Sequence, residues 1–111
     1  PAIVNFVNNS DHTIQVMAGN MMEMEPDVIK NAAPGQTIKI KTKREKLDFL
    51  QLVVIGTGKM SYTVANAAGQ ANTLTGKVLM DNLWYTPEEL GNGMVGRKAI
   101  SQHDAPLHWL S

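Results

Sequence analysis

The stretch VVIGTGKMSYTVANAAG, residues 53–69, decides the fold because it supports two incompatible interpretations. In one, Gly56 and Gly58 open a phosphate-binding turn between a strand and a helix, as in the dinucleotide fingerprint G-x-G-x-x-G. In the other, the same glycines lie in a turn that joins two antiparallel strands. The first interpretation makes the chain a small nucleotide-binding unit, and the second makes it a β domain.

The residues after Gly58 favour the turn. Residues 59–74, KMSYTVANAAGQANTL, hold β-branched and aromatic side chains, an internal glycine and no charge beyond the first lysine, so a helix built from them would have no solvent face. A doubly wound sheet also needs further units, and only 30 residues follow Asp81, the acid that would end its second strand. We therefore predict strands near 48–55 and 60–66, joined by a turn in which both glycines adopt positive backbone angles.

Further strands are predicted on both sides of this stretch. Residues 2–7 and 12–18 are short β-rich runs separated by Asn, Ser and Asp, which is typical of a hairpin. Residues 37–43 alternate strictly between Thr or Lys and Ile or Thr, as in a strand with one solvent face. Residues 47–56, LDFLQLVVIG, indicate a central strand buried on both faces, and residues 74–82, LTGKVLMDN, indicate one more strand.

The remaining segments are expected to be irregular apart from one helical turn. Residues 19–36 contain two prolines and three alternating acids, which indicates a solvated acidic connector. Thr86 is expected to cap a helical turn that begins at Pro87 and stops at Gly91. The whole pattern predicts one all-β domain over residues 1–111, an antiparallel β-sandwich or flattened barrel of about 7–8 short strands.

Composition limits the classes of protein to which the chain can belong. Ten Lys and Arg balance ten Asp and Glu, so no overall field steers the molecule toward nucleic acid. The chain has no cysteine, which excludes disulfides and cysteine zinc sites and favours an intracellular protein. It also lacks a signal-peptide pattern and any apolar run near the roughly 18 residues of a membrane span. We therefore expect a cytoplasmic protein that does not span a membrane.

The motifs of common enzyme classes are missing from the sequence. No G-x-S-x-G nucleophile elbow occurs, and Met60 follows Lys59 where a P-loop has Ser or Thr. His103 and His108 lack the spacing of two metal ligands on one helical face. We expect a non-enzymatic protein with no cofactor and no bound metal.

Basic side chains form a stripe along the alternating strand of residues 37–43 and the residue after it. It comprises Lys39, Lys41, Lys43 and Arg44, in a segment that holds half of the basic residues of the chain. The stripe is a candidate patch for an anionic ligand or a membrane surface. The alternative is the solvent face of an edge strand, where lysines discourage aggregation. No aromatic side chain is interleaved with the lysines, which argues against nucleic acid.

The most specific candidate site is DNLWY, in which Asp81, Asn82, Trp84 and Tyr85 combine an acid, an amide and two aromatic rings. Aromatic rings stack on sugar faces while the polar groups bind hydroxyls, and similar rings lie at membrane interfaces. The leading hypothesis is therefore a non-enzymatic module that binds a glycan or a lipid head group through these residues. The alternative for Trp84 is a core anchor at the end of a strand.

The sequence is also compatible with two other functions. One is a structural or assembly protein whose β edges pair into a homo-oligomer, which the balanced charge and apolar strands permit. The other is the small nucleotide-binding unit built on Gly56 and Gly58.

Overall fold

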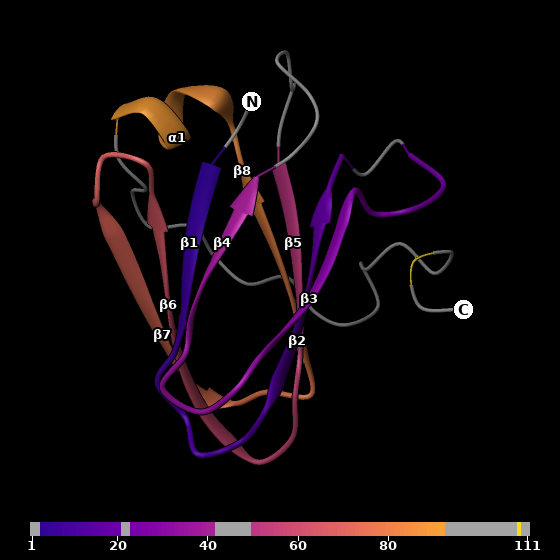
Figure 1. The fold of residues 1–111 in the computed structure, drawn as a ribbon, viewed down its shortest axis with the longest axis vertical. Helices are drawn as coiled ribbons and strands as arrows, with labels where there is room; N and C mark the ends of the chain where they lie inside the picture. The colour runs from indigo at the N-terminus through magenta and orange to yellow at the C-terminus, as the bar shows by residue number, and fades with distance from the viewer. Residues whose placement is uncertain (1–2, 21–22, 42–49, 93–108, 110–111) are drawn as a thin grey trace.

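The computed structural model describes residues 3–20, 23–41, 50–92 and Trp109 (Figure 1). Its elements are β1 (Ile3–Asn8), β2 (Ile14–Gly19), β3 (Val28–Ala32), β4 (Thr37–Lys41), β5 (Leu50–Ile55), β6 (Lys59–Asn66), β7 (Ala71–Lys77), β8 (Met80–Tyr85) and the helix α1 (Pro87–Asn92). The strands form two antiparallel sheets, ordered β4-β1-β6-β7 and β3-β2-β5-β8. The sheets pack as a sandwich and do not close into a barrel, so the predicted all-β class is confirmed.

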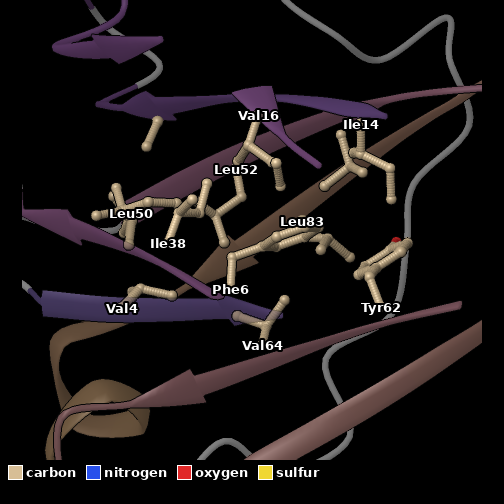
Figure 2. Close-up of a cluster of buried hydrophobic side chains, with 14 of the residues drawn as sticks. Val4, Phe6, Ile14, Val16, Ile38, Leu50, Leu52, Tyr62, Val64 and Leu83 are labelled. Carbon is tan, nitrogen blue, oxygen red and sulfur yellow. The ribbon is translucent and has the colours of Figure 1, made fainter. Parts of the chain in front are cut away.

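Alternating side chains build the core between the two sheets. Every second side chain of β1 and of β6 is fully or almost fully buried, as the two-residue period of a strand requires. The rings of Phe6 and Tyr62 stack with their centroids 5.2 Å apart. Figure 2 shows side chains of both sheets meeting in this core, among them Phe6 and Tyr62 from one sheet and Leu52 and Leu83 from the other. Tyr85 of β8 adds a further aromatic ring from the second sheet.

The strand β5 is buried on both faces, as predicted for residues 47–56. All five residues from Leu50 to Val54 are completely buried. Its inward side chains join the main core, whereas Val53 on the opposite face packs with Met17 and Trp109. Trp109 therefore covers part of the outer face of the sheet β3-β2-β5-β8, although it lies far from that sheet in sequence.

The glycine pair lies in a turn between β5 and β6, and strand β6 begins at Lys59. The helix on which the nucleotide interpretation depends is therefore absent from residues 59–66. Gly58 has the predicted positive φ, 79°, but the same prediction for Gly56 is wrong. At Gly56 the Met60 side chain lies close instead, and a Cβ there would be 2.2 Å from its sulfur, so a larger residue would require the end of this flexible side chain to move.

The sequence located most strands but not their partners. β1 and β2, predicted as a hairpin, lie in different sheets, and so do β5 and β6. The consecutive strands that do pair are β2 with β3 and β6 with β7. Alternation shows which side chains of a strand face inward. The same alternation is found whether two consecutive strands pair in one sheet or face each other from two sheets, so it does not identify the partner.

Two further predictions need correction. β3 lies inside the segment predicted as an acidic connector, because this edge strand has a weak pattern with only Ala32 fully buried. The run 74–82, predicted as one strand, is divided between β7 and β8, with Val78 and Leu79 between them. The chain crosses from one sheet to the other at these two residues, so the run cannot stay straight.

Thr86 caps α1 as the sequence predicts. Its hydroxyl accepts a hydrogen bond from the Glu89 backbone N–H at 3.3 Å, and the Glu89 carboxylate accepts one from the Thr86 N–H at 2.7 Å. This reciprocal pair is a capping box. The helix continues one residue beyond the predicted stop at Gly91 and ends at Asn92.

Asn8 joins three segments at the end of the sandwich where β1 stops. Its side-chain amide is completely buried and donates to the carbonyls of His12 at 2.6 Å and Ala32 at 2.9 Å. Its Oδ1 accepts from the backbone N–H of Ser10 at 2.9 Å and from the Ser10 hydroxyl at 2.6 Å. The Asn8 backbone also bonds to Gln36 and Gly35 of the β3–β4 turn. The Asn8 side chain therefore satisfies backbone groups of the β1–β2 connection and of the last residue of β3, and its backbone bonds to the β3–β4 turn.

Replacing Asn8 with Ala should destabilise the protein by about 2–4 kcal/mol, because buried carbonyls lose their donors. Urea unfolding monitored by circular dichroism measures this difference. Asn9→Ala is the matched control, since the exposed Asn9 side chain makes one hydrogen bond, to Thr63. Equal losses in the two variants would show that the buried network of Asn8 is not important for stability.

Replacing Gly58 with Ala should cost about 1–2 kcal/mol, because a side chain at positive φ crowds the following carbonyl. Gly58→Asn should cost less, since Asn tolerates this conformation better than other residues with a Cβ. Thermal and urea unfolding of the two variants test the order. Equal stability of Gly58→Ala and the parent protein would contradict the positive φ at this turn.

Candidate functional site

The DNLWY residues are divided between the two faces of β8, because successive side chains of a strand point in opposite directions. Asp81 faces inward, where its carboxylate accepts a hydrogen bond from the Tyr62 hydroxyl, and Tyr85 is completely buried in the main core. Asn82 and Trp84 face the other way, onto the outer face of the sheet. The four predicted contact residues therefore do not meet on one surface.

The pair of Asp81 and Tyr62 is part of the packing between the sheets. Burial is the main cause that raises the pKa of Tyr62 far above its ordinary value, and the hydrogen bond and negative charge of Asp81 raise this pKa further. The tyrosine stays protonated and keeps donating to the carboxylate. Asp81 thus has a structural partner on the inner side of β8.

The outer face of the same sheet brings together residues that the sequence analysis did not connect. Gln51 lies opposite Trp84 on one side and Gly19 on the other, and its amide donates to the Asn82 side chain. Trp109 lies over Gly19, where a Cβ would be 3.3 Å from the indole ring. Because Gln51 and Asn82 are both completely buried, their amides are not exposed to a ligand.

The basic stripe lies on β4, which is an edge strand as its alternative interpretation expects. Lys39 and Lys41 are exposed, and Lys30 of the neighbouring edge strand β3 donates to the Lys39 carbonyl at 2.8 Å. Lys43 and Arg44 lie outside the described residues. Lys39 and Lys41 therefore lie at the side of the sandwich, and the role of the stripe in binding an anion or a membrane stays a prediction.

A depression of about 500 Å³ lies at the end of the sandwich where β1 stops and β6 begins, the lower end in Figure 1. Residues from the β1–β2 connection, the start of β6 and the end of β7 form it. This end hollow is lined by Asn9, Ser10, Asp11, Lys59, Met60, Ser61, Thr75, Gly76 and Lys77. These residues carry amide, hydroxyl, carboxylate and ammonium groups, while most of the surface that lines the hollow is apolar.

The register of β6 and β7 determines which polar residues lie opposite each other at the end hollow. Ser61 lies opposite Thr75, and the next outward pair along the strands is Thr63 with Thr73. The hydroxyls of Thr63 and Thr73 are 3.0 Å apart, and Asn9 donates to the Thr63 hydroxyl at 2.7 Å. Hydroxyl groups therefore line both strands, and a hydrogen-bond network holds the wall of the hollow at Asn9.

Charged groups stand at the mouth of the end hollow. Lys59 and Lys77 are direct cross-strand partners, and both are exposed. Asp11 lies on the β1–β2 connection, with its carboxylate 3.2 Å from the His12 Nε2. The sequence analysis missed this arrangement because its residues come from three separate segments. The one local signal was the Gly58-Lys59 turn, which the sequence analysis interpreted as a connection between strands or, alternatively, as part of a nucleotide site.

Other classes of site were searched within the part of the chain that the structure describes. No three His, Asp or Glu side chains in residues 3–20, 23–41, 50–92 and 109 gather closely enough to hold a metal ion. Among the same residues, no helix has the length and apolar character needed to cross a bilayer. His103 and His108, considered above as metal ligands, lie outside the described residues.

Comparison with known proteins adds no functional information. The chain matches no protein-family model, and neither curated proteins nor solved structures show significant similarity to it. The function is therefore inferred from the geometry and chemistry of the sites themselves.

Replacing Tyr62 with Phe should lower stability at neutral pH by about 1–3 kcal/mol, because the Asp81 carboxylate loses its donor. In the parent protein the Tyr62 hydroxyl has a raised pKa, so it keeps its proton in the folded state, whereas in the unfolded chain it loses this proton above about pH 10. Stability therefore falls as the pH rises beyond that point. The fall should be shallower in Tyr62→Phe, as urea unfolding across the alkaline range would show. An unchanged slope would contradict the raised pKa.

Proposed function

We propose that this protein is a non-enzymatic glycan-binding module that holds its ligand in the end hollow. The observation that carries the proposal is the lining of this depression, where Asn9, Ser61 and Thr75 contribute an amide and two hydroxyls around a space of about 500 Å³. Small-ligand sites in proteins commonly have volumes of about 300–1,000 Å³. The hollow is thus large enough for one or two sugar rings.

The chemistry of these groups suits a polyhydroxylated ligand. A sugar hydroxyl both donates and accepts, so it is bound best where donors and acceptors stand side by side. Amides and hydroxyls do both, a carboxylate accepts, and a lysine donates. The bond from Asn9 to Thr63 also holds part of the wall in place before a ligand arrives, which reduces the entropy lost on binding.

Binding is favoured over glycoside hydrolysis by the acids that are present. Glycoside hydrolases typically use two carboxylates on either side of the scissile bond. Among the described residues that line the end hollow, Asp11 supplies the single carboxylate. Its side chain is 89% exposed, so the environment does not resemble the dry pocket that prepares a catalytic acid.

Replacing Thr75 with Val should weaken glycan binding about three- to tenfold, because a hydrogen bond to a ligand hydroxyl is lost while the shape is kept. Ser61→Ala should act in the same direction. A glycan array identifies a ligand, and isothermal titration calorimetry then gives the affinity of each variant. Thr37→Val is the matched control, since this exposed threonine lies on the same sheet but at its β4 edge, outside the hollow.

The sequence-based hypothesis predicts a different result and is tested in the same experiment. If the ligand lies near Trp84, Trp84→Ala should abolish binding in a protein that circular dichroism shows to be folded. The end hollow predicts that this variant binds normally and that Thr75→Val binds weakly. Binding to liposomes but to no glycan would contradict the proposal and favour a lipid head group.

A further inference from the structure

Lys59 and Lys77 form a like-charged pair that the fold places side by side. They are direct partners in the antiparallel pairing of β6 with β7. Directly opposite residues have their Cβ atoms about 4.5–5.5 Å apart, and like charges at such positions are destabilising. A counter-ion between the two ammonium groups would relieve this repulsion.

The protein does not itself provide this counter-ion within its described residues. No carboxylate there forms an ion pair with either lysine, although both lysines line the end hollow. The other groups beside them are the hydroxyls of Ser61 and Thr75, which are neutral and able to donate. Two cations and neutral donors around one space are the groups that bind an anion.

Asp11 is the opposing charge in this environment. It lines the same hollow and repels an anion. Two facts weaken this repulsion: its side chain is 89% exposed, so water screens the carboxylate, and its oxygen lies 3.2 Å from the His12 Nε2. Two lysines therefore face one carboxylate, all three exposed to water, and the net charge of these groups is positive.

We infer that the end hollow recognises an acidic sugar, whose carboxylate or sulfate lies between Lys59 and Lys77 while its hydroxyls bind Ser61 and Thr75. This inference rests on the proposed function and specifies the class of its ligand. Each lysine contributes a charge-assisted hydrogen bond, and the register of β6 and β7 sets their spacing.

Matched pairs of oligosaccharides test the inference. The probes are oligogalacturonate with its methyl ester, and sulfated dextran oligomers with unsulfated dextran. Each pair differs in charge but keeps the same sugar backbone. Titration calorimetry should show that the charged member of at least one pair binds more tightly, and that raising the salt concentration reduces this preference.

Variants of the charged residues test whether the preference for the charged oligosaccharide arises at the end hollow. Lys59→Gln and Lys77→Gln should each weaken binding of the charged probe about two- to fivefold, as expected for exposed ion pairs. Asp11→Asn should strengthen it, because a like charge is removed. Lys30→Gln is the control, since this exposed lysine lies on β3 of the other sheet, outside the end hollow and outside the basic stripe. Loss of binding in Lys30→Gln as large as in Lys59→Gln would show non-specific attraction and overturn the inference.

The outcomes separate the two proposals. Equal binding of the charged and neutral members, weakened by Thr75→Val, would overturn the inference and leave the glycan module standing. Binding of none of the probes, together with no signal on a broad glycan array, would overturn both. A charge preference that both Lys→Gln variants reduce and Asp11→Asn increases would support both.

Discussion

Burial of the two inner sheet faces against each other is the constraint on which the rest of the molecule depends. Each face is apolar, from Phe6 and Tyr62 on one sheet to Leu52 and Leu83 on the other, and neither face is stable in water alone. Most consecutive strands lie in different sheets, so the connections mostly pass from one sheet to the other instead of forming hairpins. Both sheets must therefore form together. The backbone groups of the connections lie where the core meets solvent, and they need hydrogen-bond partners there.

Two buried asparagines meet that requirement at opposite ends of the sandwich. Asn8 satisfies the connections near β1 and β3, as described above. Asn66 does the same at the β6–β7 turn, where its Oδ1 accepts from the backbone of Ala68 and Gln70. Both side chains are completely buried, so their hydrogen bonds form in a medium where an unmade bond is costly. The end that Asn8 secures also holds the end hollow.

The candidate site shows where reasoning from the sequence succeeds and where it stops. The sequence predicted a site made of an acid, an amide and two aromatic rings at DNLWY, whereas the proposed site in the end hollow has an acid and an amide but no aromatic ring among its described lining residues. Neighbours in sequence are not neighbours on a surface when they lie on a strand, and β8 therefore separates Asp81 and Tyr85 from Asn82 and Trp84. The hollow, in contrast, combines residues as distant as Asp11 and Lys77, which no local pattern connects.

The sequence by itself determined the all-β class, the buried strand near residues 50–55, the turn at Gly58 and the capping of α1 by Thr86. These features depend on the two-residue period, on backbone angles and on hydrogen bonds between residues close in the chain, all of which are visible locally. Only the tertiary structure decided which strands pair, how Trp109 covers the outer face of β5, and that Lys59 stands beside Lys77. Those outcomes are set by the burial of apolar surface between distant segments, and many pairings share the same local pattern until the whole core is closed.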